Sequence, residues 1–269
     1  MQKYALFAVA ILAVAATATA QEKADAEAKK RVPVNVGGVE VKAGGTVVGV
    51  VRFKGVKPEP KPLTDIAGNS FCKSCYKDGE LPQRDNVVFG KNGSDETLQN
   101  VLVYVSKGLE GKKFDPPKQP VVLDQVGCVY TPHVVAVMTG QTLEIRNSDA
   151  TLHNVMAAPR ANPGFNFGMP VKDQKSEKVF KAAELKMNLK CFMHPWMSAY
   201  VHVLEHPFFA VTGPDGTFKI QGLPPGEYEL TVLHETSLFE PTPSVAKVKV
   251  AAGKTATADF TYQPKNGAR

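Results

Sequence analysis

The sequence predicts an all-β protein, a Greek-key β-sandwich followed by a small second β-sandwich. Three observations predict this class: short runs of β-branched and aromatic residues recur, glycine and proline separate them, and no long helical period follows the N-terminus. The chain has 22 Gly and 20 Pro among 269 residues, which suits many turns. Hydrophobic residues make up 43% and charged residues 22%, ordinary values for a folded protein, so wholesale disorder is excluded.

The first twenty residues, 1–20, have the pattern of a secretory signal peptide. Lys3 gives a positive start, residues 4–16 are apolar, and residues 18–20 form a small-residue cleavage site. We expect cleavage there, export to the periplasm or the extracellular space, and no membrane span afterwards. An uncleaved anchor is the alternative. Residues 21–35 begin with alternating Glu, Lys, Asp and Ala without an apolar face and are expected to form a linker.

Residues 36–205 are expected to form one domain with N-terminal strands and an insertion. The expected strands share β-branched or alternating apolar residues and cover 46–53, 98–106, 134–138, 142–147, 186–192 and 200–204. A proline-rich loop and a Gly/Lys/Pro loop separate the first three. Short strands at regular spacing, with turns between them, are typical of a sandwich.

Residues 206–269 are expected to form the second domain, beginning at His206-Pro207. Alternating apolar and polar residues predict half-buried strands at 208–212, 217–220, 227–232, 246–250 and 255–262. Tight turns of sequence Gly-Pro-Asp-Gly and Leu-Pro-Pro-Gly join the first three.

The charge pattern argues against a nucleic-acid partner. The 32 Lys and Arg exceed the 26 Asp and Glu by six, but this excess is spread along the chain. No basic run is interleaved with aromatic residues, as nucleic-acid recognition would require.

A cluster of soft donors lies in one loop. Cys191, His194 and Met197 supply a thiolate, an imidazole and a thioether at a spacing of three. A trigonal set of two His and one Cys with a weak axial Met is the type 1 (blue) copper arrangement. We expect the second imidazole from His153, in a polar turn after strand 142–147. Because Met197 fills the fourth position, the sequence favours an electron carrier over a copper enzyme.

Residues 130–203 resemble cupredoxins of the plastocyanin/amicyanin group. The resemblance rests on residues 140–147, on His-Asn-Val at 153–155, and on the Cys-x2-His-x2-Met spacing of the loop. It implies one type 1 copper per chain and electron transfer between redox partner proteins, with electrons leaving through an exposed His194 ring. The copper ligands that it implies are His153, Cys191, His194 and Met197.

The same resemblance implies roles for neighbouring residues. Phe192 stands where related sequences often have Ser or Thr, so the Asn154 side chain is expected to find a backbone acceptor across the two ligand loops. A second N–H to the thiolate is expected from Met193. Pro195 and Trp196, the single Trp of the chain, would form an apolar collar for a partner protein.

Three cysteines remain outside this set. In an exported chain, a disulfide between Cys128 and either Cys72 or Cys75 is the first expectation, and a Cys72–Cys75 bridge is the second. A zinc-like second metal site formed by these three with His133 is a further alternative. Cys75 is followed by Tyr76 rather than His, which excludes the c-type haem attachment motif.

Residues 211–235 resemble the carboxypeptidase regulatory-like domain, a small transthyretin-like β-sandwich, through their two turn motifs. This resemblance implies a structural or docking module without catalytic residues. Two alternatives to electron transfer remain open: a copper-binding or delivery protein without redox cycling, and an extracellular scaffold or adhesion protein.

Overall fold

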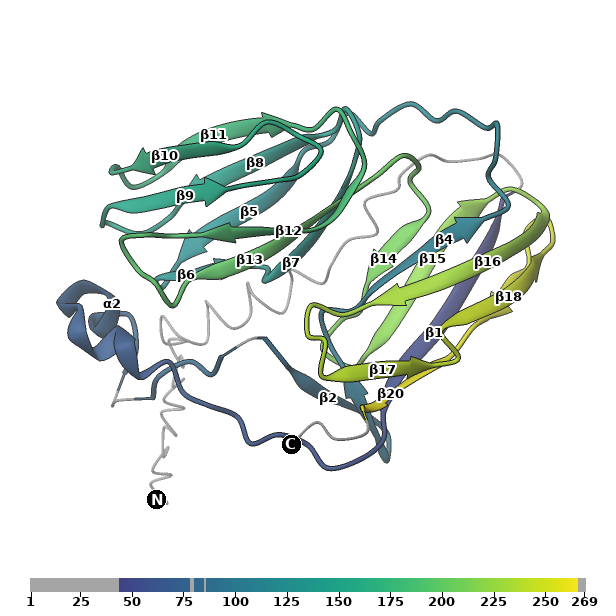
Figure 1. The fold of residues 1–269 in the computed structure, drawn as a ribbon, viewed down its shortest axis with the longest axis horizontal. Coiled ribbons are helices and arrows are strands. Elements are labelled where there is room, and N and C mark those ends of the chain that lie inside the picture. The colour runs from purple at the N-terminus through teal and green to yellow at the C-terminus, as the bar shows by residue number, and fades with distance from the viewer. Residues whose placement is uncertain (1–43, 78–79, 85, 266–269) are drawn as a thin grey trace, which may run out of the picture. The chain divides into compact units, whose positions relative to one another are not determined.

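The computed structural model describes residues 44–77, 80–84 and 86–265. The expected signal peptide and linker lie outside these residues. The described chain is all-β, as predicted (Figure 1). Its two helical segments, η1 (Thr64–Gly68) and α2 (Ser70–Ser74), have five residues each. Within the described residues, no helix is long enough and apolar enough to cross a membrane.

The first sandwich contains the middle of the chain. Its five-stranded sheet has the order β10-β9-β12-β13-β7, formed by Phe165–Met169, His153–Ala157, Glu184–Lys190, Ser198–Leu204 and Val134–Met138. Its four-stranded sheet has the order β11-β8-β5-β6, formed by Gln174–Val179, Thr142–Asn147, Val121–Val126 and Val129–Thr131. Apolar side chains from both sheets form one buried core, which η1 and α2 extend through Leu63, Ile66 and Cys72.

The second sandwich combines the two ends of the described chain. One sheet has the order β17-β20-β1-β3-β2, with β15 and β19 also paired to β1. These strands are Phe239–Thr242, Phe260–Pro264, Gly45–Phe53, Asp95–Leu98, Phe89–Asn92, Thr217–Leu223 and Thr255–Thr257. The other sheet has the order β14-β4-β16-β18, formed by Phe209–Val211, Leu102–Lys107, Gly226–Leu233 and Val245–Val250.

The placement of four strands, β1 to β4, differs from the expected division into 36–205 and 206–269, with β2 and β3 in the sheet of β1. β1 pairs with β15, β19 and β20, and β4 pairs with β14 and β16, so both belong to sheets built largely from residues after 206. The physical reason is that alternation identifies a strand but not its pairing partner. The second sandwich is therefore discontinuous in sequence.

Two expected strands are divided in the structure. The expected strand 98–106 corresponds mainly to β4, and only its first residue, Leu98, lies in β3; Asn100 between the two has a φ of +61°, which a continuing strand cannot contain. The expected strand 255–262 divides into β19 and β20, which both run parallel to β1. Strands β2, β5, β6, β9, β10, β11 and β17 were not predicted.

A disulfide joins α2 to the first sandwich. It links Cys72, in α2, to Cys128, in the turn between β5 and β6. Cys75 is a free thiol. The bond uses two of the ligands of the zinc-like alternative, and the ring of His133 bonds Ser198 O and the Glu235 carboxylate instead. The structure therefore contradicts that alternative.

Buried histidines give the fold a dependence on acid. Burial lowers the pKa of His202 to about 3 and, with smaller effects from His133 and Lys186, that of His234 to about 4. In the unfolded chain a histidine titrates near pH 6.5. As the pH falls below that value, protons bind the unfolded chain but not the buried rings, so the stability that is present above pH 6.5 is lost. We expect the free energy of unfolding to fall by up to about 1.4 kcal/mol per pH unit for each histidine.

Urea unfolding between about pH 6.5 and 4.5, above the main range of carboxyl titration, measures this loss. The variant His234→Gln should show a shallower slope than the unsubstituted protein. Equal slopes would exclude a contribution from His234.

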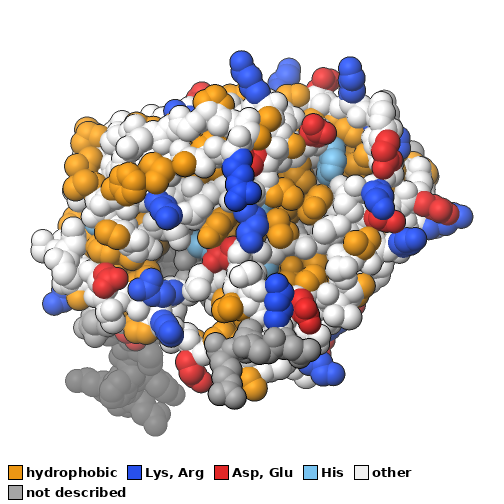
Figure 2. Space-filling model, in the orientation of Figure 1, with side chains coloured by type: hydrophobic (Ala, Val, Ile, Leu, Met, Phe, Trp, Pro, Cys, Tyr) orange, Lys and Arg blue, Asp and Glu red, His pale blue; other side chains and the backbone are white. Residues whose placement is uncertain are grey.

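Charges of both signs are mixed on the surface. On the face seen in Figure 2, Lys and Arg side chains alternate with Asp and Glu and with hydrophobic side chains. On this face, no single-sign patch would direct a strongly charged partner.

Candidate metal centre

Strand pairing brings the two expected ligand segments together. β12 pairs with β9 through Leu189 with Ala157 and Lys190 with Met156. Cys191 follows directly after β12, and His153 begins β9. Residues almost forty positions apart therefore lie at one end of the same sheet. His194 and Met197 follow in the loop between β12 and β13, which Figure 1 shows.

Three donor atoms converge at this end of the sandwich. The Nδ1 atoms of His153 and His194 lie 3.0 Å apart, and Cys191 Sγ lies 3.8 Å from His194 Nδ1. All three side chains are buried, and donor atoms of all three lie within 4.8 Å of one another. Two imidazoles and one thiolate are the ligands of a trigonal copper site, so the donor chemistry fits copper.

The loop that carries three of the expected ligands is closed by its own backbone. Cys191 N donates to Met197 O at 3.3 Å, and Met197 N donates to His194 O at 2.8 Å. These bonds hold Cys191, His194 and Met197 in one tight turn. The Met197 side chain is buried in the core of the first sandwich.

Asp149 orients the ring of His153. Its carboxylate accepts the His153 Nε2–H at 2.9 Å and the backbone N–H groups of Gly127 and Cys128 at 2.7 and 2.8 Å. With Nε2 occupied as a donor, Nδ1 is the nitrogen free to bind a metal. Burial disfavours the charged ring, but the bonds to Asp149 and Cys191 outweigh it and raise the pKa of His153. Asp149 was not among the predicted site residues, and its position four residues before His153 was the available signal.

Hydrogen bonds stabilise the thiolate of Cys191. Asn154 N donates to its sulfur at 3.3 Å. The expected donor Met193 is not among the sulfur's hydrogen-bond partners in the described part of the chain. Asn154 also joins the two ligand segments: its Oδ1 accepts from Phe192 N at 3.3 Å. The expected hydrogen bond across the two loops ran from the Asn154 side chain to a backbone acceptor. In the structure the direction is reversed, because the backbone group, Phe192 N–H, is the donor.

In the metal-free protein we expect the Cys191 thiol to titrate near pH 6. Burial raises its pKa, but hydrogen bonds from His153 and His194 and from backbone N–H groups outweigh burial and lower it to about 6. The ultraviolet thiolate absorbance of the protein, minus that of Cys191→Ser, measures this titration. A midpoint near the ordinary value of about 8.5 would contradict it.

His194 is buried, which contradicts the expected exposed ring. Its side chain is 2% exposed. Asn69, the N-cap residue of α2, covers one edge: its Nδ2 lies 3.3 Å from His194 Nε2, while its Oδ1 accepts Cys72 N. Trp196 packs nearby, with ring centroids 5.1 Å apart. The covering segment lies more than a hundred residues earlier, so the ligand motif held no sign of it.

The expected apolar collar is only partly exposed. Trp196 is half-buried, and its Nε1 donates to Cys128 O at 2.9 Å, so it joins the ligand loop to the disulfide turn. Pro195 is exposed. Phe192 and Met193 are 60% and 52% exposed, although they follow a buried ligand. The exposed apolar part of the loop is thus Phe192, Met193 and Pro195.

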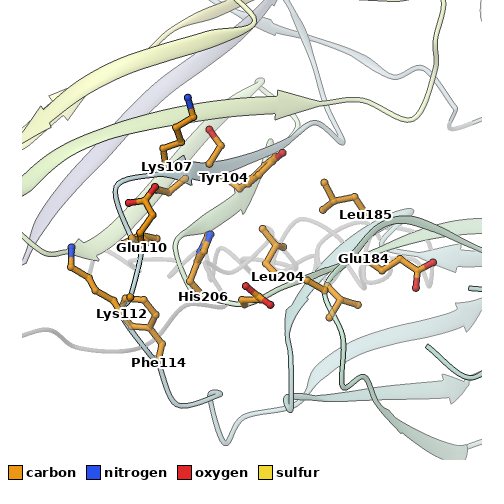
Figure 3. A pocket seen from close by; sticks show the side chains of 16 residues that line it. Tyr104, Lys107, Glu110, Lys112, Phe114, Glu184, Leu185, Leu204 and His206 are labelled. Carbon is orange, nitrogen blue, oxygen red and sulfur yellow. The ribbon is translucent and has the colours of Figure 1, made fainter. Parts of the chain in front are cut away.

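A groove elsewhere is a second candidate site. It has a volume of about 450 Å³, and its lining includes Lys107, Glu110, Lys112, Glu184 and His206 (Figure 3). Figure 3 shows the Lys107, Glu110 and Lys112 side chains on one side and Glu184 on the other. The groove shares no lining residue with the metal centre. Its lining suggests no nucleophile activated by a neighbouring base. The groove is therefore a weaker candidate for the functional site than the metal centre.

Comparisons with known proteins give only partial structural overlaps. No family model and no curated protein matches the chain. A copper-containing nitrite reductase from Thermus scotoductus SA-01 overlaps at 22% identity over 37% of this chain and 25% of the reductase, with a TM-score of 0.29. This chain therefore spans a quarter of the reductase's length.

Two cupredoxins overlap over nearly their whole length. A purple cupredoxin from Nitrosopumilus maritimus is 20% identical over 31% of this chain and 98% of its own, with a TM-score of 0.26. A Cu(I) form of a mutant amicyanin is 21% identical over 38% and 97%, with a TM-score of 0.29. At such scores the overlaps carry no functional argument. The carboxypeptidase regulatory-like resemblance of residues 211–235 stays a prediction.

Proposed function

We propose that this chain is an exported, mononuclear type 1 copper protein that carries electrons between redox partner proteins and is not an enzyme. The observation that carries the proposal is the convergence of His153 Nδ1, His194 Nδ1 and Cys191 Sγ in a buried site. Met197, in the same closed turn, is the proposed axial ligand. Bound copper would supply a one-electron couple between Cu(II) and Cu(I).

The chain's own contribution is to hold these donors in place. Asp149 fixes the His153 ring, Asn154 N–H stabilises negative charge on the Cys191 sulfur, and the core excludes water from the buried donors. Rigid, buried ligands need little movement when the charge of the site changes, which favours electron transfer.

We place partner contact on the exposed apolar side chains of the ligand loop, Phe192, Met193 and Pro195. Phe192 directly follows Cys191 in the chain and is 60% exposed, whereas Asn69 covers the ring of His194. Contact through small apolar surfaces is compatible with brief encounters.

The test is copper reconstitution of residues 21–269. We expect one copper per chain, an intense visible band, small copper hyperfine splitting in electron paramagnetic resonance, and a reversible one-electron couple. A pale solution with wide splitting would mean that the Cys191 thiolate is not a ligand and would overturn the proposal. A blue protein without a reversible couple would favour copper delivery instead.

A further inference from the structure

The disulfide beside the metal centre lies close to both ligand imidazoles. Donor atoms of Cys72, Cys128 and His194 lie within 4.8 Å of one another, and so do those of Cys128, Asp149 and His153. The Cys128 side chain is buried. Its sulfur therefore borders the two ligand imidazoles while it is bonded to Cys72.

Cys75 is the free thiol nearest in sequence to that disulfide, and its Sγ lies 3.5 Å from Phe71 O. It lies three residues after Cys72 on the same helical turn, with Cys75 N donating to Cys72 O at 3.2 Å, and side chains three apart on a helix are neighbours. The next residue, Tyr76, donates its hydroxyl to Gly127 O at 2.7 Å, which holds this segment against the turn that carries Cys128. The Cys75 side chain is partly exposed.

Hydrogen bonds to Asp149 hold the backbone of the turn that carries Cys128. Gly127 and Cys128 have φ values of +66° and +57°. The left-handed region costs a glycine nothing but is disfavoured for cysteine. Two bonds from these backbone N–H groups to Asp149 hold the turn independently of the disulfide. Cys128 would therefore remain beside the imidazoles after its sulfur was released.

We propose that Cys75 and the Cys72–Cys128 disulfide form a thiol-exchange switch that unmasks Cys128 as an additional copper ligand. This inference rests on the proposed copper site. The Cys75 thiolate attacks Cys72 Sγ; the Cys72–Cys128 bond breaks, the Cys72–Cys75 bond forms, and Cys128 leaves as a thiolate. The Cys75 proton is released, and no oxidant or reductant is consumed.

Exchange changes the donor set from one thiolate to two. A site with Cys128 and Cys191 thiolates favours Cu(I), because soft thiolates select that ion. Burial, with a smaller effect from Asp149, raises the pKa of Cys75. The attacking thiolate is thus a minor species near neutral pH, which slows the exchange, and the Cys72–Cys128 bond is the form that the structure contains.

The first test compares two variants that differ at one sulfur. Cys72→Ser with Cys75→Ser leaves Cys128 free, and adding Cys128→Ser gives a matched control that also lacks the disulfide. In competition with a Cu(I) chelator, we expect the first to bind Cu(I) at least about tenfold more tightly, a difference of about 1.4 kcal/mol. Equal affinities would overturn the inference.

The second test needs no change to the disulfide. The unsubstituted protein, metal-free or loaded with Cu(I), is trapped with an acid-active alkylating reagent and digested with trypsin. Cleavage after Lys73 separates Cys72 from Cys75, so their bond yields a cross-linked peptide pair, which should increase with Cu(I) and be absent in Cys75→Ser. A Cys72–Cys128 cross-link alone in every sample would overturn the inference.

The visible spectrum of the same copper-loaded samples separates the two proposals. An intense thiolate band together with equal affinities or an unchanged cross-link means that only the switch fails. Absence of the band from the unsubstituted protein means that the copper proposal on which the switch rests fails first.

Discussion

Replacing Cys191 with serine is expected to abolish the intense visible band of the copper-loaded protein and to weaken Cu(I) binding by more than about 100-fold. Removing an outer hydrogen-bond partner of a ligand already costs about 10–100-fold, and Cys191 is the proposed ligand itself. A serine hydroxyl is a hard donor that Cu(I) does not favour. Visible absorption and competition with a Cu(I) chelator measure the two effects.

Cys75→Ser is the matched control for this prediction. It removes the other free thiol of the described chain, which lies outside the proposed ligand set. The control should keep the visible band at full intensity. If Cys191→Ser retained the band, or if Cys75→Ser lost it, the assignment of the thiolate would be wrong.

Replacing Asp149 with alanine is expected to lower the free energy of unfolding by about 3–5 kcal/mol. Its buried carboxylate accepts three N–H groups, from Gly127, Cys128 and His153. Each buried donor left without an acceptor costs about 1–3 kcal/mol. Denaturant unfolding of the metal-free protein measures the loss.

The same variant should bind copper about 10–100-fold more weakly, because the His153 ring loses the partner that fixes its tautomer. In both stability and copper affinity, Asp149→Asn should lie between the unsubstituted protein and Asp149→Ala, since one amide oxygen replaces two carboxylate oxygens as acceptor. The control is Asp115→Ala, at an exposed position, which should change neither property. A stability loss in Asp149→Ala without any loss of copper affinity would show that Asp149 only supports the fold.

The sequence was sufficient to predict the fold class and to group the donors. Alternation and turn residues identified β8, whose bounds were predicted correctly as 142–147. The sequence spacing of Cys191, His194 and Met197 placed three of the candidate residues in one loop before any pairing was known. His153 was identified from its position in a polar turn after strand 142–147, and the resemblance implied the same ligand.

The features that sequence reasoning missed depend on contacts between distant residues. The cover of His194 comes from Asn69, 125 residues earlier, and nothing in the local pattern of either residue indicates this contact. β1 joins the sheet of β15 and β20 because its apolar face completes a core that those strands alone leave open. Long-range pairing of this kind is decided by burial across the whole molecule.

The Asn69 contact links the folding of a small helix to the loading of the metal. Because Asn69 Oδ1 accepts Cys72 N, its Nδ2 faces His194 Nε2 as a donor, which leaves the ring proton on Nδ1. A metal held at Nδ1 would require the ring proton to be on Nε2, where it would face the Asn69 Nδ2 donor across the same contact. Metal uptake would therefore oppose the helix cap.

Metal binding and formation of the cap would then be coupled equilibria. By thermodynamic reciprocity, loss of the cap would raise the metal affinity by the same factor by which bound metal lowers the equilibrium constant of cap formation. If copper binds as proposed, its apparent affinity would therefore depend on a helix cap outside the ligand set, because the Asn69 amide and the displaced ring proton would compete for the same nitrogen, His194 Nε2.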